Sequence, residues 1–106
     1  MKIRIFQIKK EFFREWAFMR YDWFKGHGHE KMDRGMYDLV WEGETEACSL
    51  NEVYEQFNLY HPEDFKGHSL SVSDLVEREE GMWFVDDFGF KKVEWDDGEQ
   101  RGEDRG

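Results

Sequence analysis

Between residues 69 and 95 the sequence alternates short apolar runs with breaks that contain glycine. The apolar residues are Leu70 and Val72, then 75–76 and 82–85, then Phe88, Phe90 and Val93. The breaks at 79–81 and 87–89 have the length and glycine content of hairpin turns. Strands joined by such turns are antiparallel, because each strand returns beside the one before it. The pattern therefore predicts a C-terminal antiparallel β-meander of three strands.

The spacing in the first half of the chain predicts two further strands. Ile3 and Ile5 alternate with polar residues, which predicts an N-terminal strand at about residues 2–8. Residues 37–42 alternate in the same way, and we expect Gly43 to end that strand. The aromatic-rich segment 12–24 fits either helical spacing or a short buried strand at 16–19, and its type stays open. The glycines within 26–29 predict a loop.

One helix has both a start signal and a stop signal. Ser49 and Glu52 form a capping box, in which hydroxyl and carboxylate satisfy backbone donors at the helix start. Pro62, the only proline, prevents helix beyond His61. The residues between have the i, i+3, i+4, i+7 spacing of one apolar stripe: Leu50, Val53, Tyr54 and Phe57. These signals predict a capped amphipathic helix at about 50–58.

Aromatic residues supply the material for a single core. The 106 residues include 10 Phe, 5 Trp and 4 Tyr, and each aromatic side chain can bury roughly 150–250 Å². This length suits one domain. No residue after Trp95 has a side chain suited to a core, so we expect a small α+β domain at 1–95 and an acidic mobile tail at 96–106.

The sequence carries no signal for a membrane or for secretion. Its longest apolar run, at 16–19, is far shorter than the ~20 residues of a membrane span. The first residues alternate polar and apolar side chains, unlike the apolar stretch of a secretory signal. Cys48 is the only cysteine, which excludes a disulfide within the chain. These features favour a cytoplasmic protein.

The distribution of charge indicates what kind of partner the chain binds. The formal net charge is -10. Residues 1–40 hold 9 Lys or Arg and 6 Asp or Glu, whereas residues 41–106 hold 6 and 19. An acidic surface repels phosphates and anionic lipids, so we expect neither direct nucleic-acid binding nor membrane binding. A charged partner is expected to be basic, while the alternative is a solvated surface that keeps the protein soluble.

A His-x-His-Glu cluster at His27, His29 and Glu30 has residue types that bind divalent metals. A structural zinc site would need further ligands, such as His61, His68 or Cys48. No helix is expected to hold the two imidazoles on one face, so the cluster is interpreted as a polar loop, and no metal is predicted.

A second cluster offers the residue types of a nucleophile, a base and an orienting carboxylate. It consists of His61, His68, Ser69, Ser71, Ser73 and Asp74. The local signatures of hydrolases are absent, as are G-x-G-x-x-G, the phosphate-binding P-loop and paired cysteines. We interpret these residues as turns and loops, which predicts no enzymatic activity and no cofactor.

Acidic residues near the predicted strand ends are the candidate partner-binding site. The candidates are Glu42, Glu44, Glu46, Glu79, Glu80, Asp86 and Asp87. Duplex DNA carries one charge per ~1.7 Å of axis, so a domain faces more phosphates than this chain has excess acidic residues. The charge therefore allows partial nucleic-acid mimicry or a plug for a narrow basic channel.

Residues 61–76, HPEDFKGHSLSVSDLV, together with 83–93, WFVDDFGFKKV, resemble the YodL-like domain, as do the segments 3–8, 37–44 and 53–58. The family motif places His61, Pro62, Phe65, Gly67, His68, Ser69, Ser71, Ser73 and Asp74 in a role that we expect to be structural. The resemblance implies a bacterial domain often carried by conjugative elements and phages, with no established catalytic mechanism.

Together, the resemblance and the charge predict a non-enzymatic acidic inhibitor from a mobile element. Its expected target is a basic host protein that handles nucleic acid, such as a restriction or CRISPR nuclease. The alternative is a module that binds another cytoplasmic protein through exposed aromatic residues, without nucleic-acid mimicry.

Overall fold

The computed structural model describes residues 1–96, so the expected tail lies outside the described part except for Asp96. The predicted α+β class and the three-stranded C-terminal meander are confirmed. Single 3-10 turns at Lys10–Phe12 and Arg34–Met36 precede the first helix and the second strand. The main elements are β1 (Lys2–Ile8), α1 (Phe13–Trp16), α2 (Tyr21–Gly26), β2 (Tyr37–Glu44), α3 (Leu50–Leu59), β3 (Leu75–Arg78), β4 (Gly81–Val85) and β5 (Phe90–Val93).

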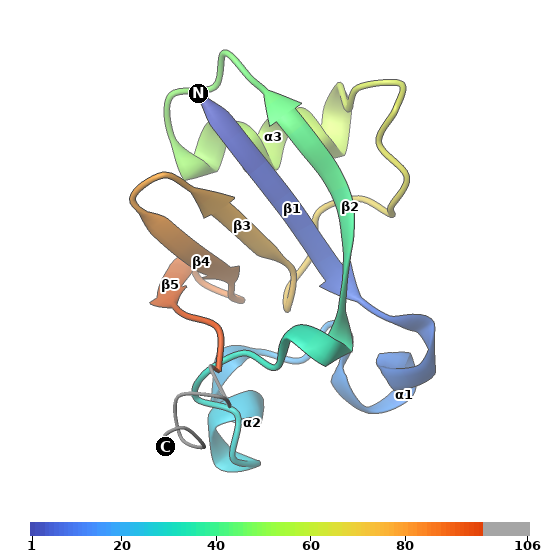
Figure 1. Cartoon of the computed structure of the whole chain (residues 1–106), viewed down its shortest axis with the longest axis vertical. Helices are drawn as coiled ribbons and strands as arrows, with labels where there is room; N and C mark the ends of the chain where they lie inside the picture. Colours follow the sequence, from blue (N-terminus) through green and yellow to red (C-terminus); the bar gives the residue numbers. More distant parts are fainter. Residues whose placement is uncertain (97–106) are drawn as a thin grey trace, which may run out of the picture.

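The first strand of the chain is the central strand of the sheet. The strand order is β2-β1-β3-β4-β5, and every neighbouring pair is antiparallel (Figure 1). Ile5 pairs with Trp41 of β2 on one side and with Val76 of β3 on the other. The register with β2 shifts after Ile5, which is the mark of a β-bulge. Both flanks of β1 are therefore hydrogen-bonded.

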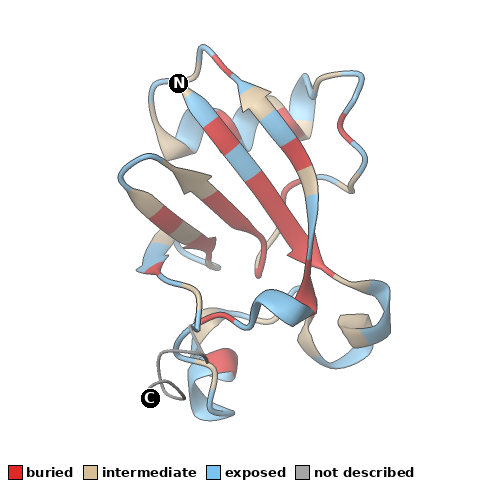
Figure 2. Ribbon diagram, viewed as in Figure 1, coloured by how far each residue is buried: buried red, intermediate tan, exposed pale blue. Residues whose placement is uncertain are grey.

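Each face of the sheet carries its own apolar core, because successive side chains of a strand point to opposite faces. On one face, Ile3 and Ile5 pack with Val53 and Phe57 of α3. On the other face, Phe6 and Ile8 pack with residues from the α1–α2 region. The second half of β1 is buried without interruption, since both cores meet there (Figure 2).

The capped helix is confirmed as α3. Ser49 Oγ accepts a hydrogen bond from the Glu52 N–H at 3.2 Å, while the Glu52 carboxylate accepts one from the Cys48 N–H at 2.7 Å. The carboxylate thus reaches one residue further back than in a standard capping box. Val53 and Phe57 are buried, whereas Tyr54, expected on the apolar stripe, is exposed. No helix within residues 1–96 is long and apolar enough to cross a membrane.

Several boundaries differ from the expectation. Gly43 does not end β2, which continues to Glu44. The segment left open forms two short helices, α1 and α2, separated by residues 17–20. Leu70 and its neighbours lie in a loop rather than a strand, and the side chains of Gln7 and Asp74 hydrogen-bond to backbone groups of this loop. Phe88, counted among the apolar residues of a strand, is 90% exposed in the β4–β5 turn.

Candidate functional site

A groove lined with glutamates lies between the end of β2 and α3. It is a shallow hollow, open to solvent, with a volume of about 520 Å³. Thr45, Ala47, Gln56 and Tyr60 also line it, and no Lys or Arg of the described residues does so. Three other grooves of the described chain each include a Lys or Arg. The acidic residues of this groove, called the acidic groove below, are Glu44, Glu46, Glu52 and Glu55.

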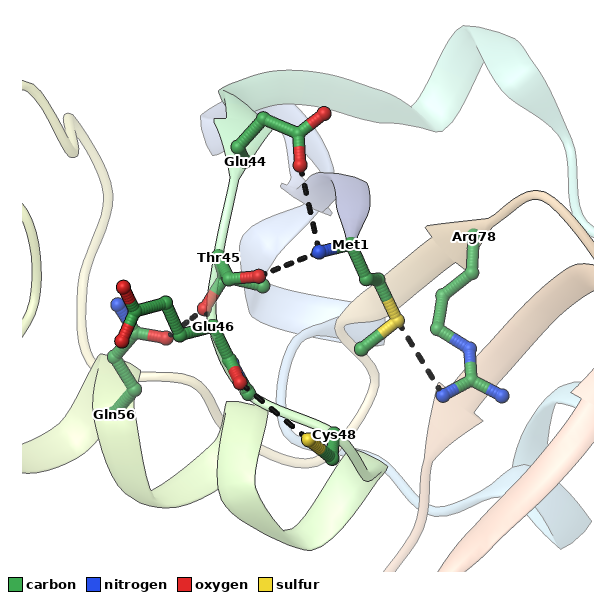
Figure 3. A network of polar contacts seen from close by, with 8 residues as sticks. Met1, Glu44, Thr45, Glu46, Cys48, Gln56 and Arg78 are labelled. Atoms are coloured by element: carbon green, nitrogen blue, oxygen red, sulfur yellow. Dashed lines mark hydrogen bonds and ion pairs between the residues drawn. The ribbon is translucent and has the colours of Figure 1, made fainter.

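A buried threonine fixes the two walls of the acidic groove to each other. Thr45 Oγ1 donates a hydrogen bond to Gln56 Oε1 of α3 at 2.5 Å and accepts one from the Ala47 N–H at 3.1 Å. The Met1 amino group donates to Thr45 O at 2.6 Å, and the Thr45 N–H donates to Met1 O at 2.8 Å (Figure 3). The β1–β2 ladder thus extends past Glu44 and holds the loop against α3.

The candidate acidic residues do not form one continuous surface. Glu44, Glu79 and Glu80 line a hollow with Met1 and Lys2. Asp86 and Asp87 follow β4 at the end away from the β3–β4 turn, so they lie apart from that hollow. The set therefore divides between two ends of the sheet.

Cations partly neutralise most of the candidate carboxylates. Glu42 pairs with Arg4 Nε at 3.0 Å and with Lys2 Nζ at 3.9 Å. Three further ion pairs have N···O distances of 3.2–3.4 Å: Glu44 with the Met1 amino group, Glu80 with Arg78, and Asp87 with Arg20. Such pairs reduce the field that a basic partner would meet. Within the acidic groove Glu44 is paired in this way, whereas Glu46 and Glu55 have no ion pair among residues 1–96.

Asp86 is half-buried and has a structural role in the fold. Its Oδ1 accepts hydrogen bonds from the Tyr21 N–H at 3.0 Å and the Asp87 N–H at 2.9 Å. Tyr21 is the first residue of α2, so this carboxylate satisfies a free backbone donor at the helix start. The fold thus uses Asp86 to join α2 to the β4–β5 turn, and its place in the partner-binding site stays a prediction.

The family motif forms a buried polar network around Gln7 of β1. Gln7 Nε2 donates to His68 O at 2.8 Å and to Asp74 Oδ2 at 3.0 Å, and its Oε1 accepts from the His68 N–H at 3.1 Å. The Ser71 N–H donates to the same Asp74 oxygen at 2.8 Å. A Cβ at Gly67 would collide with the Gln7 carboxamide. The side chains of Gln7 and Asp74 therefore bind backbone groups of the loop. These bonds do not depend on the side chain at position 68.

Burial makes two groups of this network weaker acids than usual. It raises the pKa of Asp74 well above the ordinary 3.8, although hydrogen bonds from Ser71 and Gln7 oppose the shift. Burial, and then the charge of Asp74, raise the pKa of Tyr37. The Tyr37 hydroxyl donates to Ser73 O at 2.8 Å. Both groups favour their neutral forms, because a desolvated charge is costly.

The serines of the motif do not hydrogen-bond to the His68 ring in the described chain. Ser71 Oγ donates to Ser69 O, and Ser73 Oγ accepts from the Phe18 N–H. His68 Nδ1 lies 2.7 Å from Ser69 O, the geometry of a ring N–H donating to a carbonyl. These contacts close the loop and leave no hydroxyl joined to the imidazole.

Two residues with positive φ meet where this loop touches the α1–α2 connection. Phe18 has φ 67° and Ser73 has φ 84°. Such a backbone costs energy in residues other than glycine, so surrounding contacts must maintain it. The Phe18 ring is 52% exposed and packs on Phe13 and His68, with ring centroids 5.2 and 5.4 Å away. The fold thus holds an aromatic ring at the surface on a constrained backbone.

His27 and His29 lie beside Trp16, with ring centroids 6.0 and 4.8 Å from the indole. Their rings therefore make aromatic contacts that the sequence interpretation did not include. The described residues contain no group of three His, Cys, Asp or Glu placed to hold a metal ion.

The single antiparallel sheet with α3 on one face and α1 and α2 on the other defines a small α+β domain with surface grooves. The model of the YodL-like domain matches residues 2–95, and the chain belongs to that family. No curated protein and no solved structure matches this chain.

Proposed function

We propose that this protein is a non-enzymatic cytoplasmic binding protein whose acidic groove receives a basic segment of a partner that handles nucleic acid, and that binding inhibits the partner. The observation that carries the proposal is the acidic groove itself, which has four glutamates and no Lys or Arg among its described lining residues. Opposite charges across an interface accelerate association and select the partner.

The pattern of charge favours a local plug over mimicry of a long duplex. Phosphates along DNA are evenly spaced and carry no interleaved cations. Here, Arg4 lies between Glu42 and Glu77, and other candidate carboxylates have cations of their own. A narrow basic channel that admits one edge of the domain matches this surface better than a groove that holds many base pairs.

Charge reversal in the acidic groove tests the proposal. Glu46→Lys with Glu55→Lys alters two exposed residues of the groove, and Glu11→Lys with Glu94→Lys makes the same change in net charge at exposed positions outside it. Affinity capture from a bacterial lysate, read by quantitative mass spectrometry, should yield basic nucleic-acid-binding proteins with the parent and the control pair. The groove variant should lose them, and added DNA should displace them. Equal capture by both variants would contradict the proposal.

A second candidate is binding through exposed aromatic residues without mimicry. It is favoured by the Phe18 ring, which the constrained backbone holds half-exposed, and by Phe88 in the neighbouring β4–β5 turn. The turn and the Phe18 segment are tied by the Arg20–Asp87 ion pair and by the hydrogen bond from Tyr21 to Asp86. The double variant Phe18→Ala with Phe88→Ala would then lose the captured proteins, whereas the charge-reversed groove variant would keep them. That result would select this candidate.

A further inference from the structure

The outer edge of β2 has unpaired backbone groups near the acidic groove. Within residues 1–96, β2 pairs only with β1 and lies at the edge of the sheet. Met1 and Thr45 exchange both backbone hydrogen bonds, so they form a hydrogen-bonded pair of the antiparallel ladder. Pairs of that kind alternate with non-bonded pairs, and Lys2↔Glu44 and Arg4↔Glu42 are of the second kind. The N–H and C=O groups of Glu42 and Glu44 therefore point away from β1.

The chain itself contacts the middle of this edge. The Lys66 N–H donates to Val40 O at 3.3 Å, and Trp41 Nε1 donates to Asp64 Oδ1 at 2.8 Å. The loop after α3 thus lies beside the middle of β2. The bond to Val40 O also shows that groups on this edge accept a donor from outside the sheet. Glu42–Glu44 comes directly after these contacts and lies next to the acidic groove.

The charge of this edge determines its occupant. Glu42 and Glu44 are exposed but paired with cations, whereas the exposed Glu46 and Glu55, which line the groove with Glu44, have no ion pair among residues 1–96. A second copy of the chain added β2 to β2 would bring like charges together, which disfavours pairing. An extended segment rich in Lys and Arg would place opposite charges there instead. Main-chain hydrogen bonds give affinity in strand addition, and side chains give specificity.

We propose that the edge of β2 at Glu42–Glu44 accepts an extended Lys- and Arg-rich segment of the partner as a sixth strand. This inference rests on the proposed function and adds how the basic segment binds. The added strand continues past Glu44 over the acidic groove, so its basic side chains meet the glutamates there. Backbone pairing fixes the direction of the segment, which charge attraction alone does not.

A peptide of alternating valine and lysine serves as the probe, with a second version methylated at every backbone nitrogen. The methylated peptide keeps its charge but loses the donors on both edges. Isothermal titration calorimetry should show that methylation weakens binding about tenfold for each hydrogen bond lost. Amide NMR signals of Glu42 and Glu44 should shift and become protected from hydrogen exchange only with the unmethylated peptide.

Two protein variants test the same contact from the other side. Glu42→Pro removes an outward donor without removing a bond to β1, a position where an edge strand tolerates proline. Glu42→Thr removes the same charge and keeps the N–H. Binding of the unmethylated peptide should fall about tenfold further in Glu42→Pro than in Glu42→Thr. Equal binding of both peptides to the unmodified protein would overturn strand addition and leave the proposed function standing. Failure of both peptides to bind would overturn strand addition and also count against a basic partner.

Discussion

Gln7 and Asp74 are 67 residues apart in the chain, yet Gln7 Nε2 donates a hydrogen bond of 3.0 Å to the buried carboxyl of Asp74. This contact connects the central strand of the sheet with the family motif. The other hydrogen of the same amide goes to His68 O. The Gln7 side chain therefore provides hydrogen-bond partners for polar groups of the loop, which has no neighbouring strand to provide them.

Gln7→Ala should destabilise the fold more than His68→Ala. Removing the amide leaves buried donors and acceptors unpaired, which costs about 2 kcal/mol or more. His68→Ala keeps the backbone groups that Gln7 binds and loses the ring contact with Ser69 O and the packing on Phe13 and Phe18. Because His68 and Phe18 are partly exposed, this loss should total about 0.5–1.5 kcal/mol. Urea unfolding of both variants measures the difference. A larger loss in His68→Ala would mean that the imidazole, rather than the backbone, holds the loop.

Asp74→Asn should change how stability depends on pH. Because burial raises the pKa of Asp74, the folded state holds this proton more tightly than the unfolded state. The contribution of this group to the free energy of unfolding is full below the unfolded pKa and falls as the pH rises towards the folded pKa, then stays constant. Urea unfolding across that range should show the parent losing stability relative to Asp74→Asn. A difference independent of pH would contradict the assignment.

Phe57→Ala should cost about 3–5 kcal/mol, because it removes a fully buried ring. The Phe57 ring packs edge-on against Trp41 and Phe65, with centroids 5.0 and 5.1 Å away. Leu59→Ala on the same helix is the control, since Leu59 is 63% exposed and its loss should cost under ~0.5 kcal/mol. Thermal unfolding compares them, and similar melting temperatures would show that Phe57 is not a core residue.

Gly67→Ala should destabilise the protein by about 1–3 kcal/mol, because the new methyl group meets the Gln7 carboxamide. In a Gln7→Ala background this penalty should shrink, since the obstructing group is gone. Gly26→Ala is the matched control: it lies at the end of α2 with no atom within 4 Å of the added carbon. Denaturant unfolding of the four single and double variants measures the coupling, and strict additivity would rule out the collision.

The helix and the meander could be predicted because their signals are local. Ser49, Glu52 and Pro62 act within a few residues of the backbone that they control. The arrangement of the sheet could not be predicted in this way. Nothing near Arg4 in the sequence indicates that Glu77 will lie beside it, because sheet pairing joins distant segments. The segment 12–24 stayed open because α1 and α2 are too short to establish a helical period.

The candidate site was only partly predictable for the same reason. The acidic residues were identified from the sequence, but the Arg4–Glu42 ion pair, whose partners are 38 residues apart, and the helix-capping role of Asp86 depend on tertiary contacts. Gln7 was missed although it shares a strand face with the apolar Ile3 and Ile5. A polar side chain on a buried face is the signal that would have found it.

The central place of β1 also determines how the chain must fold. Its contact between Arg4 and Glu77 spans 73 residues, so most of the polypeptide forms a loop that closes when this pairing forms. Closing so long a loop costs conformational entropy before the contacts between β1 and β3 can form. Folding is therefore slower than in proteins whose strands pair locally. Until β3 pairs with β1, one edge of this apolar strand can pair with other chains. The protein is therefore most prone to aggregation before β1 and β3 have paired.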